Sequence, residues 1–222
     1  MKLSLTPDEL TQYVVLQLNT FFPLDDVKEK DISPLVKISL ERIEACFLPI
    51  NRKYYRESGE VIFNHLNTDH YATFLYFLAN SAFRHRDEAK LPSKVYALNK
   101  ALHSIEANYE ISLPEIFMFV HPVGSVLGRA QYSDYFCVYQ GCTVGANVDG
   151  SLPVIGEGVV LYSGVCVIGD SAIGNNCMIS AGTTLVNGNV PDNSVCFRDG
   201  NDISIRQNVH DVKETIFHGT TS

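Results

Sequence analysis

One histidine in the second half of the chain could do acid-base chemistry. His121 is the only histidine between residues 105 and 200. An unperturbed imidazole titrates at about 6.5, so it can take a proton from an attacking hydroxyl or amine near neutral pH. A carboxylate on the far ring nitrogen would fix the tautomer and stabilise the imidazolium, as in catalytic triads. Glu106, Glu110 and Glu115 are the acidic residues between position 105 and this histidine, and they compete for that role. The plainer interpretation, a histidine at the surface or satisfied in the core, stays open from these residues alone.

Metal chemistry is not predicted. A zinc site in this half would need several histidines, and only His121 is present. None of the six cysteines forms a C-x-x-C pair, and five of them occur singly within a repetitive segment, which favours buried reduced thiols over disulfides or zinc. The cysteines are Cys46, Cys137, Cys142, Cys166, Cys177 and Cys196.

Helix signals dominate the chain before residue 105. Thr6-Pro7-Asp8-Glu9 has the pattern of an N-cap, a proline at the first helical position and an acidic residue at N3, so a helix is expected from Pro7. Ser33-Pro34 predicts the start of a second helix, which Pro49 would end. Thr68-Asp69 precedes a third, strongly apolar helix, and Pro92 starts a fourth.

A six-residue period replaces the helical period after residue 105. In the clearest stretch, every sixth residue is a large aliphatic one: Ile155, Leu161, Val167, Ile173, Ile179 and Leu185. Upstream the same frame gives Val120, Val126, Tyr132, Val138 and Val144. Small residues follow most of these positions four places later, and a five-residue excess at 149–153 joins the two runs. Six-residue repeats of this kind are the pattern of a parallel β-helix.

The repeat fixes what each position has to do. Three hexads close one coil, the aliphatic column fills the prism, and residues 120–190 would make roughly four coils. Glycines such as Gly156, Gly158, Gly164 and Gly174 are expected at tight corners, where positive φ is cheap for glycine. The prediction is an α+β chain with an N-terminal all-helical domain (1–104), a β-helix domain (105–200) and a C-terminal tail (201–222).

The stretch from Ile155-Gly156-Glu157-Gly158-Val159 to Ile179-Ser180-Ala181-Gly182-Thr183 resembles the hexapeptide-repeat acyltransferases. Within them the layout of a helical half before a short β-helix is similar to serine O-acetyltransferase, and Leu113 to Gly145 resembles the catalytic stretch of that family. The resemblance covers residues 104–200. It implies a left-handed winding of the β-helix and acyl transfer from acetyl-CoA without a metal.

The resemblance also implies roles for single residues. His121 falls at the position of the family's general base, and Glu106 lies at the spacing of the carboxylate that orients it. Gly145 matches a glycine near the reacting thioester, while Ser163 and Ala181 match the small residues along the pantetheine arm. Asp69 is a weaker candidate, because carboxylates of the helical half help to bind serine in the family.

Two departures from the family pattern concern the acceptor. The aspartate before the catalytic histidine is Val120 here, and an Arg-His-Pro sequence of the extended loop is replaced by Ser151-Leu152-Pro153. Acetyl transfer to L-serine is therefore one expectation, and transfer to a sugar or nucleotide sugar of surface-polysaccharide synthesis is the alternative. A non-catalytic β-helix scaffold is the third interpretation.

Charge and composition narrow the partners. The net charge of −8 argues against nucleic acid and anionic membrane surfaces. Residues 105–200 contain two arginines against nine acidic residues, so coenzyme A would depend on pantetheine contacts, backbone donors and a few cations such as Arg198. No apolar run is long enough for a membrane span, and the N-terminus lacks the apolar stretch of a signal peptide, which predicts a cytoplasmic protein.

Self-association is expected from the flat sides of the prism. The family packs as trimers, and the aromatic residues Tyr135, Tyr139 and Tyr162 would suit a packed face. The sequence therefore predicts a homotrimer with a small-molecule acceptor. A dimer of trimers through the helical half is a further possibility.

Overall fold

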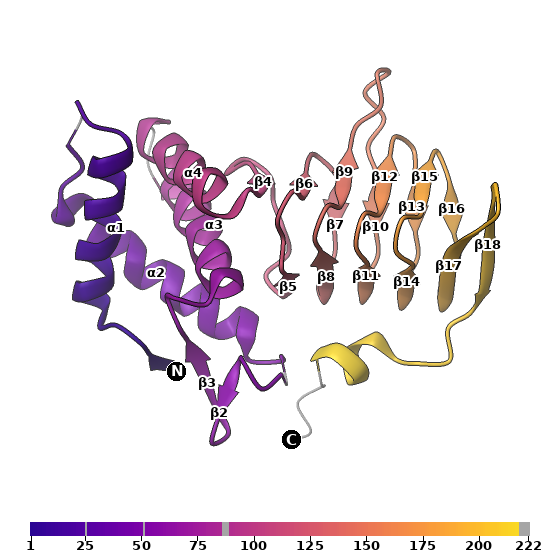
Figure 1. Ribbon diagram of the computed structural model, residues 1–222, viewed down its shortest axis with the longest axis horizontal. Coiled ribbons are helices and arrows are strands. Elements are labelled where there is room, and N and C mark those ends of the chain that lie inside the picture. Colours follow the sequence, from indigo (N-terminus) through magenta and orange to yellow (C-terminus); the bar gives the residue numbers. More distant parts are fainter. Residues whose placement is uncertain (25, 51, 86–88, 218–222) are drawn as a thin grey trace.

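The computed structural model describes residues 1–24, 26–50, 52–85 and 89–217. A helical region forms one end of the molecule, and a parallel β-solenoid of about five turns forms the other (Figure 1). The fold class predicted from the sequence is confirmed as helical region followed by solenoid. The left-handed winding stays a prediction from the resemblance.

The first helix lies at the outer end of the helical region and packs against the second, which runs from there toward the solenoid (Figure 1). Helix α1 (Pro7–Phe21) begins with the predicted capping box, in which the Thr6 hydroxyl accepts from the Glu9 N–H and the Glu9 carboxylate accepts from the Thr6 N–H. Helix α2 (Glu29–Phe47) begins earlier than predicted, so Pro34 lies inside it. A proline removes only its own N–H, and the buried apolar face that continues on both sides of Pro34 keeps this segment helical.

Helix α3 is the centre of the helical region. It spans Thr68–His85 and is buried along most of its length, between α2 and α4 (Lys90–His103). The region is not all-helical, because three short strands form a small sheet in the order β1-β3-β2. These strands are Lys2–Leu3, Arg56–Glu57 and Glu60–Phe63, numbered β1 to β3 along the chain.

Three sheets form the sides of the solenoid, and parallel pairing connects each coil to the next. The six-stranded side contains β5 (Phe117–Val120), β8 (Phe136–Tyr139), β11 (Val159–Leu161), β14 (Cys177–Ile179), β17 (Ser194–Asp199) and the antiparallel β18 (Asp202–Gln207). The five-stranded side contains β4 (Glu106–Ala107), β6 (Val126–Leu127), β9 (Thr143–Gly145), β12 (Cys166–Ile168) and β15 (Thr184–Val186). The four-stranded side contains β7 (Gln131–Tyr132), β10 (Val154–Ile155), β13 (Ala172–Ile173) and β16 (Asn189–Val190).

The register confirms the predicted aliphatic column from Tyr132 onward and corrects it in the first coil. Phe119 pairs with Val138, and Leu127 pairs with Val144, so Phe119 and Leu127 fill the interior. Val120 is half-buried, and Val126 is 39% exposed. The hexad frame failed here because the interior residues Phe119 and Leu127 are eight residues apart, and Leu127 and Tyr132 only five.

Glycines serve the corners for two different reasons. Gly158 and Gly164 have positive φ, as predicted. Gly156 and Gly174 do not; instead, a Cβ on Gly156 would lie 2.7 Å from the backbone carbon of Gly174 in the next coil. Close approach of neighbouring coils, rather than a left-handed backbone, requires glycine at these two positions.

The C-terminal segment returns along the solenoid toward the helical region (Figure 1). After β18 it forms one π-helical turn, Lys213–Phe217, in which Phe217 is fully buried. Arg52 of the helical region donates to the carbonyl oxygen of Thr215 at 3.3 Å, so the tail contacts both parts of the molecule. No helix within the described residues is long and apolar enough to cross a membrane.

Candidate functional site

His121 lies at the corner directly after β5, with its side chain open to solvent. Its φ of +49° is uncommon for a residue with a side chain, and strained backbone of this kind concentrates at functional sites. The side chain is 77% exposed, so one ring face can meet a ligand from outside. The imidazole therefore lies at the surface, where the first coil turns.

The corner that carries His121 is enlarged. The interior residues Phe119 and Leu127 are two residues further apart than the six-residue spacing of Leu161 and Val167 in a later coil. The extra length is accommodated by a tight turn, in which the N–H of Val123 donates to the carbonyl oxygen of His121 at 2.7 Å. The backbone N–H of His121 faces the helical region, where it meets a side chain of α3.

Asp69 of helix α3 is the carboxylate that meets His121. One oxygen of its carboxylate, Oδ1, accepts from the backbone N–H of His121 at 3.1 Å, and the other, Oδ2, lies 3.7 Å from the imidazole Nδ1. Asp69 sits in the first turn of α3, where the side chain of Asn67 accepts from its N–H at 3.0 Å. The N-terminal end of a helix favours negative charge, so this is a suitable position for a carboxylate.

Burial gives the Asp69 carboxylate an unusual environment. Its side chain is only 14% exposed, and this burial raises the pKa of Asp69, while the N–H and the ring of His121 lower it. The net direction is upward. A largely desolvated carboxylate beside an exposed imidazole can hold Nδ1 and leave Nε2 free to take a proton from a ligand.

Glu106 has other partners. Its carboxylate accepts from the Tyr96 hydroxyl and forms an ion pair with Lys100, both on helix α4. Burial raises the pKa of Glu106, but the hydrogen bonds from Lys100 and Tyr96 outweigh it, so the pKa lies below its ordinary value. The described contacts of Glu106 thus tie β4 to α4, and the contact with the imidazole comes from Asp69 instead.

Two of the predicted binding residues, Ser163 and Ala181, lie at the corner that follows the six-stranded side, and Arg198 is aligned with them within β17. The register aligns Phe119, Val138, Leu161, Ile179 and Cys196 in successive coils. Two residues beyond each of these lie the members of a column that we call the corner column. They are His121, Gln140, Ser163, Ala181 and Arg198.

Contacts between neighbouring coils connect the later members of the corner column, whereas in the first coil the N–H of Gly141 donates to the carbonyl oxygen of Val123 rather than of His121. The N–H of Gly164 donates to the carbonyl oxygen of Gln140, and the N–H of Gly182 donates to that of Ser163, both at 2.9 Å. The sequence identified Ser163, Ala181 and Arg198 but not Gln140, because glutamine is larger than the small residues that occupy this position in the later coils. Gly145 lies elsewhere, at the far end of β9 on the five-stranded side.

A groove runs beside the upper part of the corner column. It has a volume of about 490 Å³, and one wall is the outer face of the six-stranded side, with Tyr162, Met178, Ser180 and Val195. Residues 206–210 of the returning tail form the opposite wall. Tyr162 also contacts Tyr139, with ring centroids 5.1 Å apart, and both are half-buried. The groove offers an apolar floor with polar edges next to Ser163.

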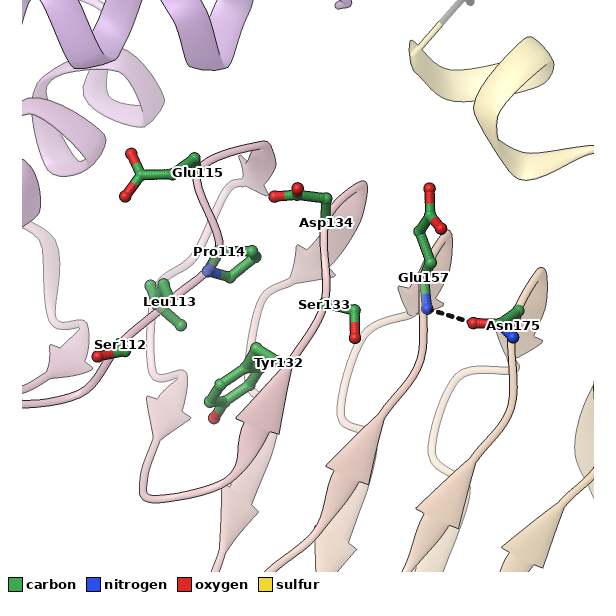
Figure 2. Close-up of a pocket in the computed structure, with 9 residues that line it drawn as sticks. All are labelled: Ser112, Leu113, Pro114, Glu115, Tyr132, Ser133, Asp134, Glu157 and Asn175. Atoms are coloured by element: carbon green, nitrogen blue, oxygen red, sulfur yellow. Dashed lines mark hydrogen bonds between the residues drawn. The ribbon is translucent and has the colours of Figure 1, made fainter.

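A second pocket, at a different corner, is accounted for by structural contacts. Figure 2 shows it between the loop at Glu115 and the coil corners that carry Asp134, Glu157 and Asn175. Asp134 accepts from the N–H of Ile116 at 3.0 Å, and Asn175 accepts from that of Glu157 at 2.8 Å. Glu115 forms salt bridges with arginines of α2 and α3, and Glu157 forms one with a lysine of the tail. These polar groups connect neighbouring coils to each other, and the solenoid to the helical region and the tail.

Metal binding finds no support in the described part of the chain. No group of three or more histidine, cysteine, aspartate or glutamate residues is placed there to hold a metal ion. The cysteines described are free thiols, and five of the six are buried.

Comparison with known proteins gives a result for structure but not for sequence. No family model matches the chain, and no curated protein matches it in sequence. Solved structures do match. Serine acetyltransferase from Vibrio cholerae has a TM-score of 0.70 at 16% identity, covering 92% of this chain and 81% of that one. The chain has the serine acetyltransferase fold.

Two further solved serine acetyltransferases carry ligands. The enzyme from Brucella abortus in complex with coenzyme A matches with a TM-score of 0.68 at 16% identity, over 92% of this chain and 83% of that one. Isoform 3 from Entamoeba histolytica, in complex with cysteine, matches with a TM-score of 0.63 at 17% identity, over 90% and 73%. The likeness extends over both the helical region and the solenoid.

Proposed function

We propose that the protein is an acetyltransferase that moves the acetyl group of acetyl-CoA to the hydroxyl of a small acceptor, with L-serine as the first candidate. The observation that carries the proposal is the His121–Asp69 pair at the lower end of the corner column. The fold supports it, since solved serine acetyltransferases include a complex with coenzyme A.

His121 is the general base in this proposal, and Asp69 positions it. Nε2 of His121 takes the proton of the acceptor hydroxyl as the oxygen attacks the thioester carbonyl carbon. The tetrahedral intermediate then expels the thiolate by breaking the carbon–sulfur bond, and the imidazolium returns the proton to sulfur. The products are the acetyl ester and free coenzyme A, so the proton balances without a covalent enzyme intermediate.

The dimensions of the corner column suit the donor. Four coil spacings of about 4.8 Å separate the coils of His121 and Arg198, which gives roughly 19 Å. The pantetheine arm has about the length of four extended residues, ~14 Å. With its thioester at His121, the arm would pass Gln140, Ser163 and Ala181, and the phosphates would come within reach of Arg198. The groove of about 490 Å³ beside Ser163 provides apolar contacts along this path.

The proposed role of Gly145 depends on a neighbouring subunit. It ends a strand on another side of the prism, and a Cβ there would have only the side chain of Ile168 near it, at 4.0 Å. In a trimer, the family arrangement inferred from the sequence, this face would meet a neighbouring subunit. We therefore assign Gly145 to the site only as part of such an assembly. The homotrimer and a cytoplasmic location belong to the same proposal.

The aromatic residues expected at a trimer face are not free. Tyr135 packs edge-on against Phe217 of the tail, with ring centroids 5.5 Å apart, and Tyr139 and Tyr162 contact each other. A packed face on the six-stranded side would have to displace the tail. Up to Phe217, the tail packs along the six-stranded side and its corner, so the four- and five-stranded sides are the candidates for a packed face.

The direct test is release of coenzyme A from acetyl-CoA with L-serine, on wild type and His121→Ala in parallel. We expect serine-dependent turnover that falls by at least about 10²-fold in the variant. Turnover with amino sugars but not with serine would instead support the sugar acceptor, which the lost Arg-His-Pro sequence favours. Absence of acetyl-CoA binding by calorimetry would refute both and leave the scaffold interpretation.

A further inference from the structure

The last strand of the solenoid has an unprotected edge. Within the described residues β18 pairs only with β17, and it lies at the end of the molecule farthest from the helical region (Figure 1). Five of its six residues are exposed, including Ile203 at 41% and Ile205 at 44%. An exposed edge strand with apolar side chains presents free N–H and C=O groups to another strand.

The pairing with β17 determines which backbone groups of β18 are free. The N–H of Asn208 donates to the carbonyl oxygen of Asn193 at 2.7 Å, and Ser204 lies opposite Phe197. Hydrogen-bonded and non-hydrogen-bonded pairs alternate in an antiparallel ladder. The N–H and C=O groups of Ser204 therefore point toward β17, and those of Ile203 and Ile205 point outward.

The side chains of β18 are self-complementary. In a two-fold antiparallel pair centred on Ser204, Asp202 faces Arg206 of the other copy, and Ile203 faces Ile205. The outward backbone groups of Ile203 and Ile205 would then meet their counterparts as a hydrogen-bonded pair. Opposite charges directly across an antiparallel pair are favourable, and so are paired β-branched residues.

We propose that β18 forms this antiparallel pair with β18 of a second copy of the chain, joining the two six-stranded sides into one continuous sheet. Both charges are available for it. Asp202 and Arg206 are exposed, and neither forms a salt bridge with any residue that the structure describes. The Arg206 guanidinium lies over the Phe197 ring at 5.5 Å, on the strand next to the free edge.

Charge selects the centre of the pair. A two-fold axis at Ile203 would place Asp202 opposite Ser204, and an axis at Ile205 would place Arg206 opposite Ser204. The first register would also place Arg206 opposite Gly200, and the second would place Asp202 opposite Asn208, so both charges of each copy would face uncharged residues. The axis at Ser204 pairs both, and its two Asp202–Arg206 contacts are symmetric, as a closed two-fold interface requires.

The pair would double whatever assembly the rest of the molecule forms. It lies at the end of the solenoid, so it differs from a dimer of trimers held through the helical half. His121 and Asp69 are on the first coil and on α3, at the other end of the solenoid. The pairing therefore does not depend on the proposed catalytic function.

Cysteine cross-linking tests the register directly. In a non-hydrogen-bonded antiparallel pair the two Cα atoms lie about 4.5 Å apart, within the range of a disulfide. Ser204→Cys in the full-length protein should therefore form a covalent dimer on mild oxidation, seen as a doubled mass without reductant. Asp202→Cys is the matched control, since the two copies of position 202 would be about 14 Å apart. Equal cross-linking of the two variants, or none in Ser204→Cys, would overturn the proposal.

Charge exchange tests the same pair without cysteine. We expect Asp202→Lys to halve the mass measured by light scattering at a given concentration, because it places two cations opposite each other. The double variant Asp202→Lys with Arg206→Glu should restore the wild-type mass. Circular dichroism and thermal unfolding confirm that both variants are folded. Unchanged mass in folded Asp202→Lys would overturn the proposal and favour association through the helical half.

Discussion

Replacing Asp69 by asparagine tests the contact between the helical region and the imidazole. The substitution removes one charge and keeps an oxygen that can accept from the N–H of His121, so the backbone contact at 3.1 Å can persist. Oδ2 lies 3.7 Å from Nδ1, longer than a hydrogen bond, so its effect on the imidazolium is mainly electrostatic. Two unit charges at this distance interact by about 1 kcal/mol in water and about 4 kcal/mol at an effective dielectric constant of 20.

Because the imidazole ring is exposed, its interaction energy with the carboxylate lies near the lower of these two values. With the His121 side chain 77% exposed, solvent screens the interaction, and about 1–2 kcal/mol is appropriate. We therefore expect Asp69→Asn to lower kcat/KM of serine-dependent acetyl transfer by roughly 5- to 30-fold. His121→Ala should lower it much further, because the variant loses the base itself. Stability should change little or rise, since burial raises the pKa of Asp69 and the neutral amide avoids that cost.

Glu106→Gln is the matched control, because it neutralises a carboxylate whose described partners are Lys100 and Tyr96. We expect kcat/KM within about 2-fold of wild type for this variant. Steady-state kinetics and thermal unfolding of the two variants, measured together, separate the two carboxylates. A larger loss in Glu106→Gln than in Asp69→Asn would refute the reasoning and restore the role that the sequence spacing suggested for Glu106.

Three further predictions concern stability and the donor site. Burial lowers the pKa of His70 to about 4, so the unfolded state binds more protons than the folded state between about pH 6.5 and 4. As the pH drops through this window, His70 alone should lower the free energy of unfolding by roughly 3 kcal/mol, in addition to His103, whose pKa burial also lowers to about 4. Urea titrations of wild type and His70→Asn would show a shallower fall in the variant. Gly156→Ala should destabilise the protein by about 1–3 kcal/mol, because its Cβ would lie 2.7 Å from the backbone of Gly174. Gly145→Ala has room for a Cβ, so its free energy of unfolding should stay within about 0.5 kcal/mol of wild type. Equal stabilities of the two variants would contradict the close-approach argument. Arg198→Ala should raise KM for acetyl-CoA by roughly 5-fold with kcat unchanged, and a loss in kcat alone would remove Arg198 from the phosphate site.

The solenoid could be predicted from the sequence because its physics repeats. Each coil buries one large apolar residue per side, so the frame is defined by many equivalent positions and a single atypical residue does not change it. The column from Tyr132 to Leu185 follows the predicted frame. The first coil departs from this frame because its enlarged corner changes the spacing. As a result Phe119 and Leu127 fill the interior in place of Val120 and Val126. Local helix signals worked where capping chemistry decides, as at Thr6, and failed at Pro34, where tertiary packing decides.

The site was only partly predictable for a related reason. His121, Ser163, Ala181 and Arg198 belong to the repeat or border it, so a pattern could find them. The partner of His121 comes from a helix 52 residues earlier in the chain, and sequence spacing within the second half cannot reveal it. The signal that existed was the helix start at Thr68-Asp69, which places a carboxylate among the free N–H groups of the first turn but does not say what faces it.

The enlarged corner explains why the helical region and the solenoid need each other for the proposed chemistry. His121 lies two residues beyond Phe119, as Gln140 lies two beyond Val138, but the carbonyl oxygen that accepts from Gly141 of the next coil belongs to Val123. The backbone of His121 is left-handed, and Asp69 of α3 supplies the acceptor for its N–H. The same carboxylate lies 3.7 Å from Nδ1, so one side chain accepts from the strained backbone and acts electrostatically on the ring. Docking of α3 against the first coil is thus a condition for a positioned imidazole, and a solenoid without its helical region would keep the corner column but lose the oriented base.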